Sequence, residues 1–223
     1  MKWQGYFYFE QTPTRERGSI VFIPRHYKET DMEKIKQFIQ QHGFGTVVTA
    51  KEGKPIATHT PVMLRKLKRD YYITGHIAKA NPQWKTFGNG RNEVLVMFQG
   101  PHAYISSSWY KEEDVPTWNY QSVHVYGTAE IMSEEELKED LILLLEKYES
   151  HREKAALWEN LSPQTLKQIR GVVGFKIKIN EVQAAYKLSQ NRTREDYQNI
   201  IDKLYEENDL NANKVADEMK DKL

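Results

Sequence analysis

The amino-acid sequence predicts an α+β protein that is mainly β, with a closed or half-closed barrel, flanking helices and a helical C-terminal tail. Runs rich in β-branched and aromatic residues follow one another with short spacers, as antiparallel strands do. Several spacers contain the glycine that is typical of tight hairpins. The regular alternation of strand and helix that builds a doubly wound sheet is missing. Short strands without that alternation favour a barrel.

Composition excludes several classes of protein. The 223 residues include no cysteine, which excludes disulfides and thiolate metal ligands. Lys and Arg number 32 against 31 Asp and Glu, so the net charge of +1 gives no global electrostatic case for nucleic-acid binding. No apolar run approaches the roughly 18 residues of a membrane span, and no secretory signal opens the chain. We therefore expect a cytoplasmic protein with no membrane partner.

The chain divides into three parts of different character. Residues 1–20 are aromatic and then charged, with no usable period, so we expect a poorly ordered N-terminal extension. Residues 21–188 carry the strand and hairpin signals and are predicted to form the barrel domain. Residues 189–223 are polar with helical spacing and are predicted to form the helical tail.

The first predicted helix spans residues 30–43. Thr30 and Glu33 form a capping box, apolar residues recur with helical spacing, and Gly43 supplies the C-terminal stop. Two β-rich runs then flank "KEGKP", which predicts a hairpin. "RKLKRD" is expected as a charged turn, and "YYITG" as a third strand.

The middle of the chain predicts a short helix and three more strands. Asn81 and Pro82 are typical of a helix start. "EVLVMFQG" and "HAYISSSWY" are expected as two strands broken at Gly100-Pro101, and "KEEDVPTWNY" as a loop. Gly127, within "SVHVYGTAEIM", indicates a β-bulge or the close approach of another segment.

The last third begins with a long helix, whose start is a second capping box made by Ser133 and Glu136. A short helix opens at Ser162-Pro163 and stops at Gly171. "VVGFKIKINEVQAAYKLS" alternates apolar residues with lysines, so it is predicted to be a half-buried strand.

The stretch "YYITGHIAKANPQW" is the first candidate site. A strand end, Gly75 and a capped helix start could expose backbone N–H groups, which together with a lysine commonly hold a phosphate. Thr74 could donate a hydroxyl, and His76 and Lys79 a charge or a hydrogen bond. The more common alternative is a capping turn with solvated His and Lys. The GxxxxGK[ST] and GxGxxG patterns are both absent, so nothing favours a nucleoside triphosphate or a Rossmann site.

Aromatic residues gather in and beside one predicted loop: Trp109, Tyr110, Trp118 and Tyr120. Their flat faces suit stacking on a planar ring system or a subunit interface, and ordinary packing of a long loop is the more common alternative. "KLSQNR", residues 187–192, carries two amides and two cations. Amides can bind the edge of a heterocycle, and the alternative is a polar end to a strand.

Four histidines lie on or near predicted strands, but no HExxH motif and no carboxylate at matching spacing accompanies them. We therefore predict no metal site. "SSSW" lacks the GxSxG pattern of a nucleophilic serine, and no acid–base pair stands out, so no catalytic residue is predicted. These histidines are His59, His76, His102 and His124.

Six segments together resemble the PaiB-type family of FMN-binding negative transcriptional regulators: "VFIPRHY", "GHIAKANPQW", "FQGPHAYISSSWY", "VPTWNY", "VHVYG" and "KLSQNR". They occur in one order, and the resemblance runs from about residue 21 to the end. It implies an FMN-binding split β-barrel, as in pyridoxamine-phosphate oxidases. It also implies a homodimer with flavin sites at the subunit interface.

The resemblance assigns the predicted cofactor-binding residues. Thr74, Gly75, His76 and Lys79 would hold the FMN phosphate. The paired Arg-Lys of the oxidases is replaced here by "GHIAKA", which predicts weak FMN binding or a different ligand. The remaining assignments are His59 and Thr60 facing the isoalloxazine, Gln99 bringing an amide, and Trp118 and Asn119 coming from the partner subunit.

The function so implied is negative transcriptional regulation of degradative-enzyme (protease) production and of sporulation. The sequence contains no helix-turn-helix signal and no basic stripe, so promoter DNA could be contacted directly or only indirectly. The best local candidates for phosphate contacts are Lys187, Arg192 and Arg194. The alternatives are a flavin-dependent oxidoreductase, either a reductase or an oxidase, and a barrel whose site is vestigial.

Overall fold

The computed structural model describes residues 21–88 and 93–221, and the predicted extension of residues 1–20 lies outside them. The strands are β1 (Lys28–Glu29), β2 (Phe44–Lys51), β3 (Lys54–Leu67), β4 (Asp70–Ala78), β5 (Glu93–Ile105), β6 (Thr117–Ile131) and β7 (Val172–Lys187). The α-helices are α1 (Met32–Gln41), α2 (Glu134–Glu149), α3 (Pro163–Leu166), α4 (Arg194–Glu206) and α5 (Leu210–Lys220). Short 3₁₀ helices are η1 (Arg25–Tyr27), η2 (Pro82–Thr86), η3 (Ser107–Trp109), η4 (Trp158–Asn160) and η5 (Lys167–Gly171).

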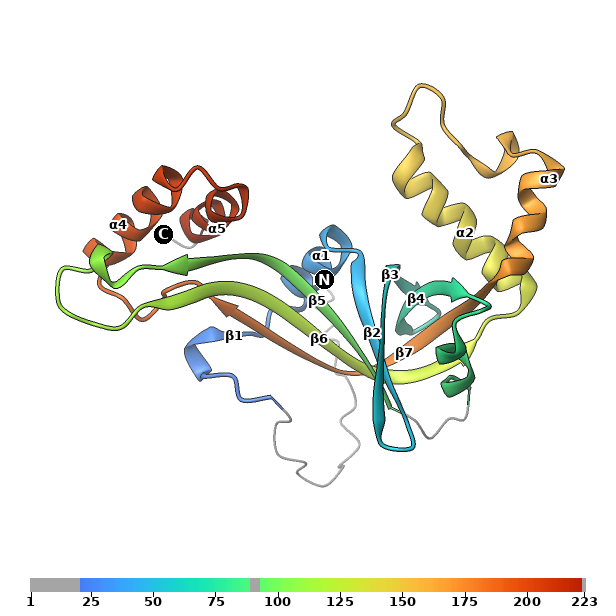
Figure 1. Cartoon of the computed structure of the whole chain (residues 1–223), viewed down its shortest axis with the longest axis horizontal. Coiled ribbons are helices and arrows are strands. Elements are labelled where there is room, and N and C mark those ends of the chain that lie inside the picture. Colours follow the sequence, from blue (N-terminus) through green and yellow to red (C-terminus); the bar gives the residue numbers. More distant parts are fainter. Residues whose placement is uncertain (1–20, 89–92, 222–223) are drawn as a thin grey trace, which may run out of the picture.

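All seven strands of the described residues form one antiparallel sheet in the order β1-β7-β4-β3-β2-β5-β6. β6 also pairs with β7, from Tyr120 opposite Lys187 to Ile131 opposite Phe175, and this pairing closes six strands into a barrel. The far ends of β5, β6 and β7 project beyond the barrel and carry α4 and α5, while α2 and α3 lie at the other end of the molecule (Figure 1). The predicted mainly β barrel with flanking helices is confirmed.

β5 is a single strand, which corrects the prediction of two strands broken at Gly100-Pro101. The sheet absorbs these residues in a register shift between Gln99 and His102, and pairing with β6 resumes on both sides. Proline has no N–H to donate, and an irregularity of this kind is one of the few places where a paired strand tolerates it.

β6 and β3 also extend past their predicted limits. β6 begins at Thr117, inside the predicted loop, because the backbone of "TWNY" pairs with β5 on one side and, from Tyr120, with β7 on the other. β3 runs to Leu67, so the predicted charged turn shrinks to Lys68 and Arg69. Charged side chains occur in strands where they point to solvent. The charged residues at these strand ends therefore did not distinguish a strand from a turn or loop.

Helix starts follow the predicted chemistry with one shift. The α1 cap is Asp31 and not Thr30, since the Asp31 carboxylate accepts hydrogen bonds from the backbone N–H groups of Glu33 and Lys34. The capping box of Ser133 and Glu136 at α2 is present as predicted.

The barrel interior is a continuous apolar cluster. Inward residues of neighbouring strands contact one another, and Phe38 and Ile39 of α1 pack onto the same cluster. Near the turn between β2 and β3, η2 inserts the fully buried Gln83, whose amide nitrogen lies 2.9 Å from Val47 O and 3.1 Å from Ile56 O. The strand residues of the cluster include Val47, Val62, Ile73, Ile77, Val94, Val96, Phe98, Val123, Val125, Phe175 and Ile177.

A second apolar cluster joins the C-terminal helices to the projecting strand ends. Ile105 of β5 and Leu188 pack against buried residues of α4 and α5. The buried Asn119 of β6 reinforces this contact, because its side chain and that of Ser189 exchange hydrogen bonds of 2.9 and 3.1 Å. The predicted tail is therefore packed onto the sheet.

Helix α2 covers the outward face of β4 and β7. A Cβ on Gly174 would lie 2.9 Å from Leu137 Cδ1, so the helix sits directly on this strand. Arg65 of β3 pairs with the buried Asp140 of α2 at 3.3 Å. His76, opposite Gly174 in the sheet, is half-buried here, and this burial lowers the pKa of its imidazole although the Asp140 carboxylate acts in the opposite direction.

Among the described residues, no helix combines the length and the apolar character that a membrane crossing requires.

We predict that no other residue is tolerated at Gly127 without a loss of stability, because β7 passes so close that an added Cβ would lie 2.2 Å from Lys178 O. The register shift between Tyr126 and Gly127 confirms the predicted bulge. We expect Gly127→Ala to lower the free energy of unfolding by about 2–3 kcal/mol in urea titrations, the usual scale of overpacking. Gly171→Ala is the control, since no atom lies within 4 Å of a Cβ there. Equal stability of the two variants would contradict this account.

The buried imidazole of His76 predicts a stability that falls in acid. Its pKa in the folded state is below the ordinary 6.5, so the unfolded chain takes up the proton first as the pH falls. His76 makes its full contribution to the stability at pH values above the pKa that it has in the unfolded chain. This contribution is lost as the pH falls from that value to the lower pKa of the folded state. Burial lowers the pKa of His42 and His124 in the same direction.

We therefore expect the difference in unfolding free energy between about pH 7.5 and about pH 5.5 to be smaller in His76→Gln than in the wild type. His151→Gln, which removes an imidazole from an exposed segment, is the matched control. An undiminished pH dependence in His76→Gln would show that this imidazole does not titrate as described.

Candidate functional site

A groove on the outer face of the barrel brings together two of the predicted residues, His59 and Gln99. His59 lies opposite Thr46, Thr46 opposite Met97, and Met97 opposite His124, so one row of side chains crosses β3, β2, β5 and β6. Side chains that face each other across a sheet point to the same side. The cavity of about 340 Å³ is also lined by Phe44, Phe98, Gln99, Tyr120 and Ser122.

Phe44 gives this groove a flat apolar wall. Its side chain is 67% exposed although it belongs to a strand, and its ring stacks on that of His59 with centroids 6.3 Å apart and planes 25° from parallel. Such a face can pack on a planar ring, and the neighbouring Gln99 amide can donate to and accept from the edge of that ring. Burial lowers the pKa of His124, which favours a neutral imidazole at the other side of the groove.

Thr74 and His76 lie elsewhere, on the face of β4 that α2 covers. Ile73 and Ile77 point into the barrel, so the alternate residues point outward. The hydroxyl of Thr74 and Nδ1 of His76 are buried and have no hydrogen-bond partner among the described residues. Buried polar atoms are rarely left unpaired, and two of them two residues apart on one strand provide places for the oxygen atoms of a ligand.

Gly75 and Thr60 have structural contacts beside this face. A Cβ on Gly75 would lie 2.9 Å from both the Phe175 ring and Pro61 O, so the position requires glycine. The Thr60 hydroxyl donates to His76 O at 2.7 Å. These two residues shape the strand pair that presents Thr74 and His76.

The backbone N–H groups of the predicted phosphate turn are engaged within the chain. Lys79 N–H donates to Gly171 O and Asn81 N–H to Ala78 O. Gln83 N–H donates to the side-chain oxygen of Asn81. These three backbone donors are therefore already used within the chain and do not form the predicted phosphate cradle.

The Lys79 side chain lines a different cavity, between α2 and the segment that precedes β7. This cavity also contains Lys138, Trp158 and Arg170. The structure therefore does not bring Lys79 into the groove of His59 and Gln99.

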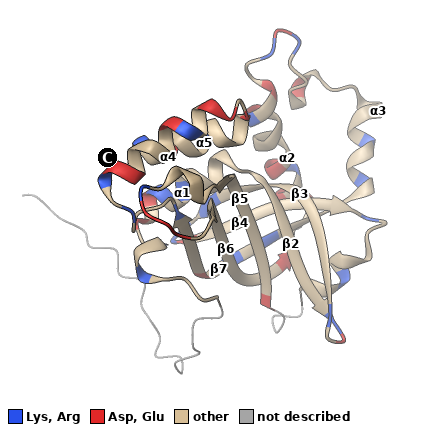
Figure 2. Ribbon diagram, turned by 60° about the vertical axis from the view of Figure 1, so that its left-hand side comes forward, with Lys and Arg blue, Asp and Glu red and all other residues tan. Residues whose placement is uncertain are grey.

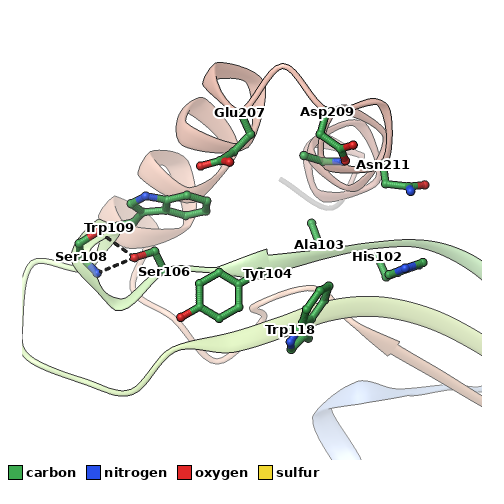
Figure 3. Close-up of a pocket in the computed structure, with 11 residues that line it drawn as sticks. His102, Ala103, Tyr104, Ser106, Ser108, Trp109, Trp118, Glu207, Asp209 and Asn211 are labelled. Atoms are coloured by element: carbon green, nitrogen blue, oxygen red, sulfur yellow. Dashed lines mark hydrogen bonds between the residues drawn. The ribbon is translucent and has the colours of Figure 1, made fainter.

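Trp118 and Asn119 point to opposite sides of β6. Asn119 is bonded to Ser189 in the same chain, as described above. Trp118 is half-exposed and contacts Tyr104 with ring centroids 5.9 Å apart. Figure 3 shows these two rings on the strands below a pocket, with Glu207 and Asp209 above it from the α4–α5 connection. Within one chain, neither Trp118 nor Asn119 therefore lies in the groove of His59 and Gln99.

Sequence reasoning missed Phe44, Thr46 and His124 as parts of one groove. The signal that could have found them is register, because each stands opposite or beside His59 or Gln99 once the strands are paired. Within the described residues, no three His, Asp or Glu side chains are close enough to hold a metal ion.

Comparison with known proteins identifies a family and several relatives. Residues 21–181 match the family described as "Putative FMN-binding domain". A curated protein of Bacillus subtilis, "Protease synthase and sporulation protein PAI 2", is 55% identical over 204 residues, which cover 91% of this chain and 98% of that protein. An uncharacterized protein of Emericella nidulans is 26% identical over 223 aligned positions, covering 81% of this chain and 89% of its own length.

Two solved structures share the fold at low identity. The FAD and heme binding protein from Mycobacterium smegmatis superposes with a TM-score of 0.58 at 16% identity, covering 77% of this chain and 79% of that chain. The flavocytochrome Anf3 from Azotobacter vinelandii gives 0.57 at 22% identity, covering 79% and 78%. The fold is the expected split β-barrel, and with the sequence matches it follows that this chain belongs to the PaiB-type family of FMN-binding domains.

Proposed function

We propose that this protein is an FMN-binding negative regulator that lowers the production of degradative enzymes, proteases among them, and restrains sporulation. The printed name of the Bacillus subtilis relative links that protein to protease synthesis and sporulation, and the family description names FMN. The observation that carries the proposal is the outer groove, where Phe44, His59 and Gln99 offer a stacking face and hydrogen-bonding edges together.

The groove fits the isoalloxazine ring better than it fits a flexible ligand. A tricyclic ring has two flat faces and an edge of alternating donors and acceptors. Phe44 can cover a face, whereas Gln99 and His59 can each both donate and accept at the edge. When bound, FMN supplies a centre that accepts and donates electrons, and the side chains around it bind and orient the ring.

The phosphate is assigned to Thr74 and His76. Their unpaired buried polar atoms fit the oxygens of a phosphate, and Thr74 donates through its hydroxyl. The lowered pKa of His76 makes its imidazole neutral near neutral pH, so it donates one hydrogen bond and adds no positive charge. Helix α2 lies over both residues, and a phosphate reaches them only beside or beneath this helix. Such a site binds FMN more weakly than a pair of arginine and lysine would.

A second copy of the chain is the proposed partner on the groove side. Phe44, Tyr104, Trp118 and Tyr120 expose aromatic surface along one face of β2, β5 and β6. Exposed apolar surface of this extent commonly marks an interface. In a two-fold dimer, the Trp118 of each subunit lies against the groove of the other subunit. This arrangement explains how Trp118 reaches the cofactor site from the partner subunit, as predicted.

Regulation is proposed to be indirect. Figure 2 shows basic and acidic residues interspersed along the ribbons of α4 and α5. Lys187 and Arg192, the predicted phosphate contacts, line a pocket of about 270 Å³, which is too small to admit a duplex. Arg194 is exposed at the start of α4. One exposed arginine gives little of the charge that duplex binding needs.

The flavin assignment predicts that Phe44→Ala weakens FMN binding about tenfold, because loss of a stacking face costs on the order of 1–3 kcal/mol. Quenching of flavin fluorescence during titration with purified protein measures the affinity. Leu210→Ala removes an equally exposed side chain on α5 and is expected to bind FMN like the wild type. An unchanged affinity in Phe44→Ala would show that the groove is not the flavin site.

The regulatory role predicts that deletion of the gene in its own host raises extracellular protease activity and advances sporulation. The wild-type gene restores both, and the Phe44→Ala gene restores them less well. If the deletion changes neither, and purified flavoprotein instead turns over with a nicotinamide donor, the oxidoreductase alternative replaces the regulator.

A further inference from the structure

A second pocket forms where three distant segments meet, and the proposed flavin site does not use it. Tyr27 comes from η1, Asp114 to Thr117 lead into β6, and Lys187 to Arg192 follow from the end of β7. Figure 1 shows β1, which follows η1, beneath the projecting ends of β6 and β7. The pocket has a volume of about 270 Å³, small beside the ~300–1,000 Å³ of typical ligand pockets.

Lys187 brings an ammonium group into this pocket without a carboxylate to neutralise it. Its Nζ donates to the Thr117 hydroxyl and to Trp118 O at 2.9 Å, both neutral acceptors. The Tyr27 ring lies 5.7 Å away. Among the described residues, no ion pair includes Lys187. An ammonium has three donors, so one remains for a further acceptor.

Arg192 adds a second positive charge, held rigidly. Its side chain is only 17% exposed, and its guanidinium carbon lies 4.0 Å from the centre of the Tyr110 ring. One N–H pairs with Asp114, whose carboxylate also accepts from Val115 N–H at 2.7 Å. Arginine has five N–H donors, so the pair with Asp114 leaves others available.

The charges of the pocket are therefore unbalanced: two cations face one carboxylate. Burial and then the charge of Arg192 lower the pKa of Lys187, because both disfavour its charged form. Asn191 accepts from the Tyr27 hydroxyl at 3.1 Å through its side-chain oxygen, which leaves its amide nitrogen as a donor. An anion would meet donors from all three residues.

We propose that this pocket binds a small oxyanion, either a phosphate group or a carboxylate, between Lys187 and Arg192 with Asn191 as a third donor. Charge-assisted hydrogen bonds to such an anion are the strong kind, and the guanidinium fork matches its oxygens. The volume fits the anionic group of a ligand and excludes a duplex. The segment "KLSQNR" then has a binding role that the flavin groove does not give it.

The test titrates inorganic phosphate into the full chain and follows both heat and thermal unfolding. We expect saturable binding and a raised Tm for the wild type, and binding at least about tenfold weaker in Lys187→Met, a loss of roughly 1.4 kcal/mol. Lys178→Met removes the same charge from the exposed pair with Asp70 and is expected to bind phosphate normally. Asn191→Asp keeps both cations, adds a negative charge at the pocket and is expected to lose binding as well.

Two outcomes would overturn the inference: no saturable phosphate binding by the wild type, or equal binding by the wild type, Lys187→Met and Asn191→Asp. Titrations with FMN and riboflavin identify the source of the anion. If Lys187→Met weakens FMN but not riboflavin, the pocket holds the phosphate of the flavin. If both flavins bind as before while phosphate does not, the anion belongs to a separate ligand. If phosphate binding fails while FMN binding is intact, this inference is wrong and the proposed function still stands.

Discussion

The pairing of β6 with β7 is the constraint on which the rest of the molecule depends. It closes the barrel, and it continues past the barrel so that the same two strands also support α4 and α5. Because alternate residues of a strand point to opposite faces, closure of the barrel places one set of side chains inside it and the other set outside. The closeness of the pairing is clearest at Gly127, where β7 leaves no room for a side chain.

Closure leaves three surfaces with different fates. Helix α2 covers β4 and its neighbours, and beneath it Thr74 Oγ1 and His76 Nδ1 are buried without a partner among the described residues. The C-terminal helices cover the projecting strand ends through a second apolar cluster. The surface across β3, β2, β5 and β6 has no such cover from the described residues, and there an exposed Phe44 lies over His59. The proposed binding residues therefore lie where folding has left aromatic surface exposed and polar atoms unpaired among the described residues.

The sequence predicted the strands and helices well where one pattern dominated. The hairpin at "KEGKP", the Ser133 capping box and the Gly127 bulge all follow from local chemistry that few other conformations satisfy. Strand ends were missed where tertiary pairing overrode local signals. Pro101 reads as a break, yet the bulge accommodates it, and "TWNY" reads as a loop because its one buried position, Asn119, is polar. The site was harder still, since no local pattern reveals that Thr46, Met97 and His124 share a row with His59.

One strand separates the open groove from the C-terminal helices. On β6, Tyr120 and His124 face the groove, whereas Asn119 bonds to Ser189 and Gln121 to Glu218 of α5 at 2.9 Å. These residues alternate along a few positions of the same backbone, so the side chains of the groove and those that anchor the C-terminal helices lie on the two faces of one strand. A substitution that displaces this stretch of β6 is therefore expected to disturb both faces together.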